Sequence, residues 1–88
     1  MGRYRIQYKS SVQKDLLAIS TKKDRQRIVH RIESLSDDPR PPTSQKLGGT
    51  DLYRVRQGDF RILYEIHDLE LVVIIVRIGD RSDVYRGL

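Results

Sequence analysis

The stretch that decides the fold is Leu52–His67, with the sequence LYRVRQGDFRILYEIH. Two runs of alternating residues flank Gly58-Asp59, and alternation with a period of two is typical of β-strands. A Gly-Asp pair between two such runs predicts a two-residue hairpin turn. The sequence therefore predicts antiparallel strands over 52–57 and 60–67, with Gln57 opposite Phe60.

This hairpin register divides its side chains into two sets, because side chains alternate between the faces of a strand. Arg56 lies opposite Arg61 and Arg54 lies opposite Leu63 on one face. Like charges directly opposite each other destabilise a sheet, so stability alone would not select three arginines there. We expect Arg54, Arg56 and Arg61 to bind phosphate; the alternative is a solvated face. The opposite face, expected to meet helices, carries Tyr53, Val55, Ile62 and Tyr64.

A third strand is predicted over 70–78, joined to the second by a turn at Asp68-Leu69. Its centre is β-branched and apolar on both faces, which indicates a central strand covered on both sides, at least in part. Its outer residues and Leu63 form an apolar strip beside the arginines. A partner is one expected cover for such a strip, and the N-terminal strand, a loop or the C-terminal tail is the other. The outer residues are Val72, Ile74 and Val76.

The N-terminal half predicts a strand over 4–8 followed by two helices. Ser10 and Gln13 suggest a capping box for the first helix, and Thr21 with Asp24 a cap for the second. Apolar residues then recur at helical spacing. They are Val12, Leu16 and Ile19 in the first helix, and Ile28, Ile32 and Leu35 in the second.

Residues 37–50 predict a loop, since five of them are Pro or Gly and neither periodicity survives there. A loop of this length in so small a protein is functional or mobile. One more short strand over 81–86 is an option at the end of the chain. The fold class is α+β, a single domain over 1–88 with an N-terminal strand and a two-helix hairpin packed on a small, mostly antiparallel sheet.

The charge of the chain points to nucleic acid. Its 88 residues contain 17 Lys+Arg and 12 Asp+Glu, a net charge of +5, and 12 of the cations are Arg. Arginine suits forked recognition of phosphate, although a solvated basic surface is an equal alternative. Residues 1–50 carry +6 and residues 51–88 carry −1. We therefore expect general attraction to RNA from the helices and the long loop, through Lys22, Lys23, Arg25 and Lys46.

The composition also excludes several classes of protein. The chain has no Cys and two His, which excludes disulfides, thiolate zinc sites and cysteine nucleophiles, and no metal or cofactor is expected. It has no apolar run of about 18 residues and no visible secretory signal, so we expect a cytoplasmic protein. His30 and His67 are expected to be solvated surface residues.

Five motifs together resemble the RelE branch of the RelE/ParE toxin superfamily, over nearly the whole chain. The resemblance implies a fold similar to small microbial ribonucleases and a toxin that cleaves mRNA, commonly in the ribosomal A site. It also implies a cognate antitoxin, with a toxin–antitoxin heterotetramer as one assembly. The motifs are Lys46-Leu47-Gly48-Gly49, Leu52–Arg56, Gly58–Ile66, Ile78-Gly79 and Arg81–Tyr85.

The family's functional residues match Arg54, Arg56, Arg61, Arg81 and Tyr85 of this chain. In such a site the ribose 2′-OH attacks its own phosphate, and the products are a 2′,3′-cyclic phosphate and a 5′-hydroxyl. Arg61, with Arg56 and Arg81, would stabilise the developing negative charge. Tyr85 would stack on a base or hydrogen-bond a phosphate oxygen.

The chain departs from the family at two points. Well-known members carry Lys at the positions of Arg54 and Arg56, and Arg stays protonated where Lys is able to move protons. Asp80 replaces a His that many relatives carry, and pairing with Arg81 is favoured over a role as base. The general acid and base are therefore not identified. A ParE-type inhibitor of DNA gyrase and a binding module without catalysis stay open as alternatives.

Overall fold

The computed structural model describes residues 2–80 and 84–86. It contains two helices and five strands: β1 (Arg5–Tyr8), α1 (Ser10–Leu17), α2 (Lys22–Ser34), β2 (Gln45–Lys46), β3 (Leu52–Gln57), β4 (Phe60–His67) and β5 (Val72–Asp80). The strands form one sheet in the order β1-β5-β4-β3-β2, in which β1 is parallel to β5 and the other neighbours are antiparallel. The predicted α+β class with a mostly antiparallel sheet is confirmed.

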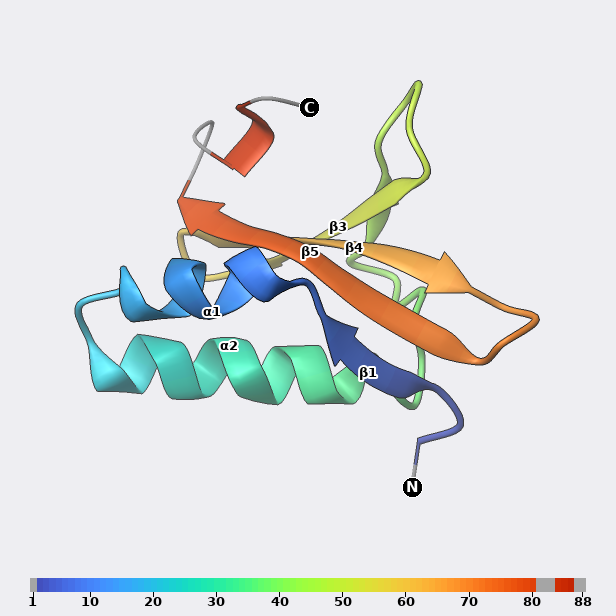
Figure 1. Ribbon diagram of the computed structural model, residues 1–88, viewed down its shortest axis with the longest axis horizontal. Coiled ribbons are helices and arrows are strands. Elements are labelled where there is room, and N and C mark those ends of the chain that lie inside the picture. Colours follow the sequence, from blue (N-terminus) through green and yellow to red (C-terminus); the bar gives the residue numbers. More distant parts are fainter. Residues whose placement is uncertain (1, 81–83, 87–88) are drawn as a thin grey trace.

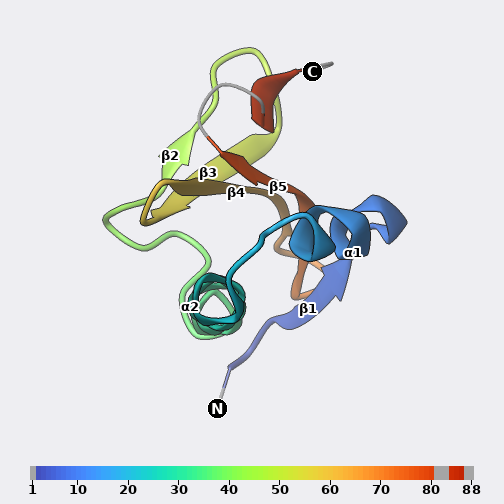
Figure 2. The ribbon, with the colours of Figure 1, turned by 90° about the vertical axis from the view of Figure 1, so that its left-hand side faces the viewer.

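Both helices lie on one side of the sheet, and the C-terminal turn lies on the other (Figures 1 and 2). The helix-side core joins the spaced apolar residues of the helices to those of β3, β4 and β5. Its fully buried members are Val12, Ile28, Ile32, Leu35, Val55, Ile62, Tyr64, Val73 and Ile75. The helical and strand periodicities of the sequence thus meet in one apolar layer. Within the described ranges, no helix has the length and apolar character needed to cross a membrane.

The central hairpin has the predicted register. Gln57 pairs with Phe60, and Gly58 opens the turn with a φ of +61°. A glycine at the first central position with positive φ is typical of a type II′ turn, whose twist matches that of the flanking strands. The local sequence around Gly58 is therefore sufficient to set which side chains of β3 and β4 share a face.

The predicted turn after β4 and the predicted bounds of the third strand are wrong. The turn after β4 is not the pair Asp68-Leu69, because His67 pairs with Val72 and leaves a four-residue loop, in which Leu71 has a φ of +55°. The pairing of β5 with β4 is shifted by two residues from the predicted pairing. Because side chains alternate with a period of two, each residue of β5 up to Ile75 still lies on its predicted face. The third strand consequently runs over 72–80 and not 70–78.

The predicted capping box is also wrong, because Lys9 is the N-cap of α1 and no side chain caps it. Thr21 does occupy the N-cap of α2, but its hydroxyl bonds Asp24 and not the backbone. Near the C-terminus, Val84 and Tyr85 form a helical turn where a strand was one option.

The loop predicted over 37–50 is interrupted by the short strand β2 at Gln45–Lys46, and its first part is anchored at the sheet by a polar network. Arg40 donates two hydrogen bonds to the carboxylate of Asp68, at 3.1 and 2.9 Å, and Tyr4 donates one at 2.7 Å. The guanidinium also lies over the ring of Tyr53, 5.3 Å from its centroid. Buried Tyr64 donates to the carbonyl of Pro39 at 2.8 Å, and its burial raises the pKa of the phenol to about 12. Residues 38–40 are thereby held to β3, β4 and the loop between β4 and β5.

This network predicts a pH effect on stability. The hydrogen bonds from Arg40 and then Tyr4 lower the pKa of Asp68 from 3.8 to about 2. A carboxyl group whose pKa is lower in the folded state stabilises the fold above the unfolded pKa, and this contribution is lost as pH falls through the folded pKa. We therefore expect Asp68→Asn to remove the part of the fall in melting temperature that occurs between about pH 4 and pH 2. Thermal unfolding measured at several pH values across this range tests it.

The matched control for this effect is Glu70→Gln, which removes a carboxylate from the same loop. Glu70 is exposed and has no hydrogen bond or ion pair with the described residues. Its variant should keep the acid dependence of the wild type. Equal acid dependence in Asp68→Asn and the wild type would contradict a stabilising role for the network.

Candidate functional site

The sheet face opposite the helices carries the three arginines singled out by the sequence. Arg56 and Arg61 are direct cross-strand partners, and Arg54 lies opposite Leu63 one row further along the hairpin. Because alternate residues share a face, Arg54, Arg56 and Arg61 form one cluster, which we call the arginine face. The predicted placement of these three side chains on one face is confirmed.

The cluster is positively charged and carries no internal counter-ion from the described residues. No Asp or Glu in residues 2–80 and 84–86 forms an ion pair with Arg54, Arg56 or Arg61. Arg56 is exposed, while Arg61 is partly buried, and the buried Nε of Arg61 has no hydrogen-bond partner within the same residues. A buried N–H without a partner costs about 1–3 kcal/mol. Among the described residues, Arg61 thus holds an unsatisfied donor beside the other two arginines.

The C-terminal turn brings Tyr85 to this cluster. Val84 is 1% exposed and packs on Leu52 and Leu63, and so covers part of the apolar strip. The sequence left open whether a partner or a segment of this chain covers Leu63. In the structure the cover is the C-terminal turn, through Val84. The Tyr85 hydroxyl accepts a hydrogen bond from Arg54 at 3.0 Å, and Arg54 also donates to the side chain of Gln45. Arg54 is therefore held between β2 and the turn.

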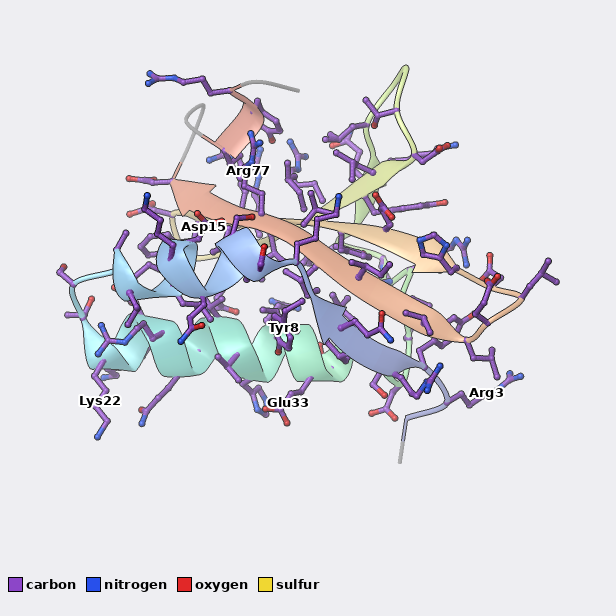
Figure 3. All side chains as sticks on the ribbon, viewed as in Figure 1. Arg3, Tyr8, Asp15, Lys22, Glu33 and Arg77 are labelled. Carbon is purple, nitrogen blue, oxygen red and sulfur yellow. The ribbon has the colours of Figure 1, made fainter. Side chains whose placement is uncertain are left out.

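Arg77 is a member of this site that the sequence analysis missed. It pairs with Leu63 while Ile75 pairs with Tyr64, so Val76 is an extra residue in a β-bulge. Without the bulge, Arg77 would share the helix face with Ile75. The bulge turns it outward, where it donates to the carbonyls of Val84, at 3.1 Å, and of Arg86, as its position beneath the turn in Figure 3 shows. Strict alternation along the predicted strand would place the charged Arg77 on the core face. This conflict is the signal in the sequence that could have indicated a bulge.

Glycine at position 79 allows the turn to approach β5 closely. A Cβ added to Gly79 would lie 3.2 Å from the Cβ of Val84 and 3.3 Å from its Cα. Gly79 lies opposite Arg61 in the sheet, on the same face. The absence of a side chain here thus lets the turn pack beside the arginine cluster.

Two of the predicted site residues near the C-terminus do not join this geometry. Arg81 lies outside the described residues, so its role stays a prediction from the resemblance. Asp80 pairs with Phe60, and this register places Asp80 on the side of the sheet that faces the helices, opposite to Arg61. The proposed pairing of Asp80 with Arg81 stays a prediction.

The predicted RNA-contacting cations lie away from the arginine face. Lys22, Lys23 and Arg25 belong to α2, in the layer on the other side of the sheet (Figure 2). Arg25 has a structural contact, because its guanidinium donates to the carbonyl of Ile19 in the connection between the helices. Lys46 lies opposite Tyr53 and so on the helix side of the sheet edge. The structure does not bring these cations together with Arg54, Arg56 and Arg61.

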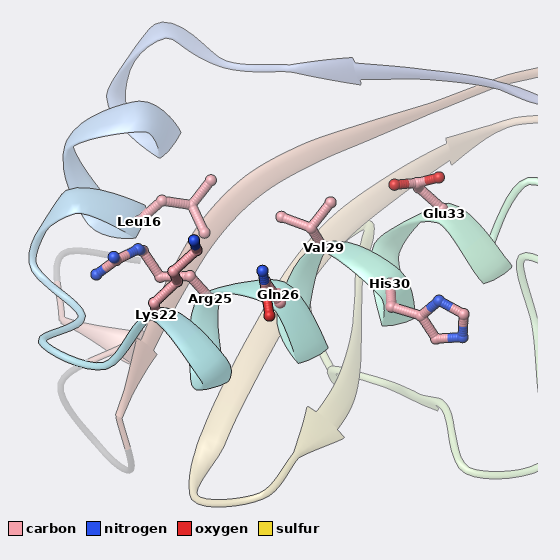
Figure 4. A pocket seen from close by; sticks show the side chains of 7 residues that line it. All are labelled: Leu16, Lys22, Arg25, Gln26, Val29, His30 and Glu33. Carbon is pink, nitrogen blue, oxygen red and sulfur yellow. The ribbon is translucent and has the colours of Figure 1, made fainter.

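A hollow of about 590 Å³ lies against α2 in the helix layer (Figure 4). Leu16 of α1 and Val29 of α2 give it an apolar floor, and most of its charged rim is basic. Charged or titratable rim residues are Lys22, Arg25, His30 and Glu33.

The arginine face has the chemistry of a phosphate-binding surface. Guanidinium groups present paired N–H donors that match phosphate oxygens, and their charge persists at every physiological pH. No group of three metal-ligating side chains occurs among residues 2–80 and 84–86. What these side chains offer a bound anion is fixed positive charge and hydrogen-bond donors.

Comparison with known proteins identifies the family of the chain. The sequence model of the family described as "ParE toxin of type II toxin-antitoxin system, parDE" matches residues 4–85. A RelE-like toxin protein of Escherichia coli is 28% identical over 87 residues, which cover 94% of this chain and 90% of that protein. Toxin RelG of Mycobacterium tuberculosis is 40% identical over 45 residues, 51% of this chain and 49% of RelG.

Solved structures show the same fold. RelE in the archaeal RelE–RelB complex of Pyrococcus horikoshii is 30% identical, with a TM-score of 0.80 and coverage of 91% of this chain and 97% of that one. A mutant E. coli toxin RelE in the free state is 20% identical, with a TM-score of 0.78 and coverage of 97% and 92%. With the family match over residues 4–85, these findings show that the chain belongs to the RelE/ParE family of type II toxin–antitoxin toxins.

Proposed function

We propose that this toxin is an endoribonuclease that cleaves mRNA and so inhibits translation. The observation that carries the proposal is the arginine face, where three guanidinium groups share a surface and have no carboxylate partner within the described residues. Such a cluster is costly to the free protein, because Arg56 and Arg61 are direct neighbours. A polyanionic substrate removes that cost by supplying the missing negative charge.

The chemistry requires no external nucleophile. In RNA the ribose 2′-OH attacks the adjacent phosphate, the bond to the 5′-oxygen of the next nucleotide breaks, and the products are a 2′,3′-cyclic phosphate and a 5′-hydroxyl. The enzyme has to align this attack and stabilise the extra negative charge on the phosphate oxygens. Arg61, with Arg56 beside it, holds the scissile phosphate. Arg54 orients Tyr85 for contact with the bound strand.

Proton transfer is the part of the reaction that the cluster supplies least well. The 2′-OH must lose a proton and the leaving 5′-oxygen must gain one, and arginine stays protonated at neutral pH. Asp80 lies on the opposite side of the sheet from Arg61. We infer that cleavage is slow on free mRNA and that the ribosome completes the site in the A site.

A defined mRNA incubated with the pure protein, with and without ribosomes, tests this proposal. We expect discrete cleavage sites by primer extension, products with 5′-hydroxyl ends, and rates at least tenfold higher with programmed ribosomes. Absence of cleavage under both conditions would refute the nuclease function. Equal rates under both conditions would refute the requirement for the ribosome but leave the nuclease function standing.

A second function, inhibition of DNA gyrase, has one observation in its favour, the description of the matching family as a ParE toxin. A gyrase inhibitor acts through binding and has no need of a cluster that grips a scissile phosphate. Supercoiling by purified gyrase in the presence of the protein distinguishes the two functions. Inhibited supercoiling together with intact mRNA would favour this second function.

We also propose an antitoxin as the protein partner, because relatives of known structure were solved as RelE–RelB complexes. The hollow beside α2 has an apolar floor with a mostly basic rim, which suits an amphipathic segment with acidic side chains. The arginine face would be a second surface for the antitoxin to cover, since masking it would block access of RNA.

A further inference from the structure

A second cavity, with mostly polar walls, opens at the end of the sheet where β3 begins and β4 ends. It has a volume of about 370 Å³, and its walls include Lys46, Asp51, Glu65 and His67. Arg40 also lines it, but its charge is balanced by the ion pair with Asp68. The lining therefore combines two carboxylates with one ammonium group and one imidazole. Walls with nearly balanced charge favour a neutral polar ligand over a free phosphate.

Two of these residues form an ordered pair. The Nε2 atom of His67 lies 2.9 Å from Oε1 of Glu65, and both side chains are partly exposed, at 43% and 29%. The sequence analysis expected His67 to be solvated and without a role. The contact orients the Glu65 carboxylate through one oxygen, and a carboxylate has acceptor sites on both oxygens, so further N–H donors find room on it. Because the contact is made by a ring nitrogen, it does not use the flat faces of the imidazole.

The pair is continuous with the arginine face. Alternation along β4 puts Arg61, Leu63, Glu65 and His67 on the same side, and Glu65 lies opposite Leu52, next to the row that holds Arg54. Four residues of strand separate Arg61 from Glu65, about 13 Å. A stacked single strand advances roughly 3.4 Å per nucleotide, so the cavity lies within about four nucleotides of a phosphate on Arg61.

The donors and acceptors of the cavity match one nucleobase. Guanine is the base whose Watson–Crick edge places two N–H donors, N1–H and the 2-amino group, beside the acceptor O6. A carboxylate such as that of Glu65 accepts from these two donors. The exposed ring of His67 provides a surface on which a base stacks.

We propose that Glu65 and His67, which lie on the same side of the sheet as Arg61, form a guanine-binding subsite for the RNA strand held by the arginine face. The inference rests on the proposed ribonuclease function and adds to it a determinant of sequence preference. Glu65 is the residue that specifies the base, and His67 is a positioning residue that fixes the carboxylate. Lys46, which the sequence predicted as an RNA contact, lines the same cavity from the helix side of the sheet edge, and its contact with RNA stays a prediction.

Binding of short uncleavable RNA analogues tests the subsite. The probes are 2′-O-methyl oligouridylates with one central guanosine or one central inosine, because inosine lacks only the 2-amino group and the methyl group blocks attack by the 2′-oxygen. We expect the wild type to bind the guanosine probe about tenfold more tightly, the effect of one hydrogen bond to a charged group. Glu65→Gln should reduce this ratio to near one, while Glu70→Gln, with the same loss of charge, should retain it. Fluorescence anisotropy at low salt gives both affinities.

The outcomes separate the subsite from the proposed function. Arg61→Ala should weaken both probes equally and keep their ratio, because it removes a phosphate contact. Equal affinity of the wild type for the two probes, or an unchanged ratio in Glu65→Gln, overturns the subsite and leaves the ribonuclease proposal standing. Failure of the wild type to bind either probe also overturns the subsite, whereas the ribonuclease proposal is decided separately by cleavage of ribosome-bound mRNA.

Discussion

Replacing Arg61 with alanine is expected to lower the rate of mRNA cleavage about 100- to 1,000-fold, the usual cost of removing one donor that stabilises transition-state charge. The same change should not lower the melting temperature. It removes the buried Nε that has no partner within the described residues, and it removes one of two like charges on direct cross-strand partners, Arg56 and Arg61. Primer extension on ribosome-bound mRNA measures the first effect, and thermal unfolding measures the second.

The opposite signs of these two effects make the prediction specific. Arg3→Ala is the matched control, because it removes the same charge far from Arg77 (Figure 3) and next to β1, which lies at the opposite edge of the sheet from β2. It should leave cleavage close to the wild-type rate. Arg61→Lys should fall between, since an ammonium keeps the charge but loses the forked geometry. Full activity in Arg61→Ala, or a large loss of stability, would contradict the assignment of this residue to the scissile phosphate.

Replacing Arg77 with alanine is expected to release the C-terminal turn from the sheet and to lower the cleavage rate about tenfold. The guanidinium of Arg77 bonds the carbonyls of Val84 and Arg86, and hydrogen bonds to charged groups contribute about 1.5–3 kcal/mol each when shielded from water. Because Arg77 is only partly buried, we expect the contribution of each of these hydrogen bonds to lie at the lower end of that range. Hydrogen exchange at the amides of 84–86 should become faster while exchange in β4 and β5 stays slow.

Gly79→Ala tests the same contact by a different route. Its Cβ would meet Val84 at 3.2 Å, so the turn must shift by a few tenths of an ångström while the charge of Arg77 stays in place. We expect faster exchange in the turn and a smaller loss of activity than in Arg77→Ala. If exchange in the turn and cleavage were unchanged in both variants, Tyr85 would not depend on Arg77 for its position. Arg77→Lys should restore part of the activity, since an ammonium reaches one carbonyl.

Much of the arginine face could be read from the amino-acid sequence. The alternation of Leu52–His67 and the Gly58 turn determine which residues are cross-strand partners, so Arg54, Arg56 and Arg61 had to share a face. The helices could be read for the same reason, because apolar residues at helical spacing report a buried stripe. These are local features, in which residues near in the chain determine one another's orientation.

Other features depended on contacts between distant parts of the chain. The bulge at Val76 leaves no local signature in an apolar run, yet it reverses the face of Arg77. Asp15 of α1 accepts a hydrogen bond from the amide of Ile78 at 3.1 Å, beyond the end of β1, a pairing that no local pattern indicates. No local pattern in the sequence marks Glu65 and His67, because the cavity that they line also needs Arg40, Lys46 and Asp51 from other segments of the chain.

The amino-acid sequence by itself determined the hairpin, the helix pair and the arginines that share one surface, because strand alternation and helical periodicity are properties of neighbouring residues. Only the tertiary structure decided that Val84 covers Leu63, that Tyr85 meets Arg54, and that Asp80 lies away from the cluster. The physical reason is that these arrangements depend on how distant segments pack, and one extra residue in β5 is enough to reverse a face.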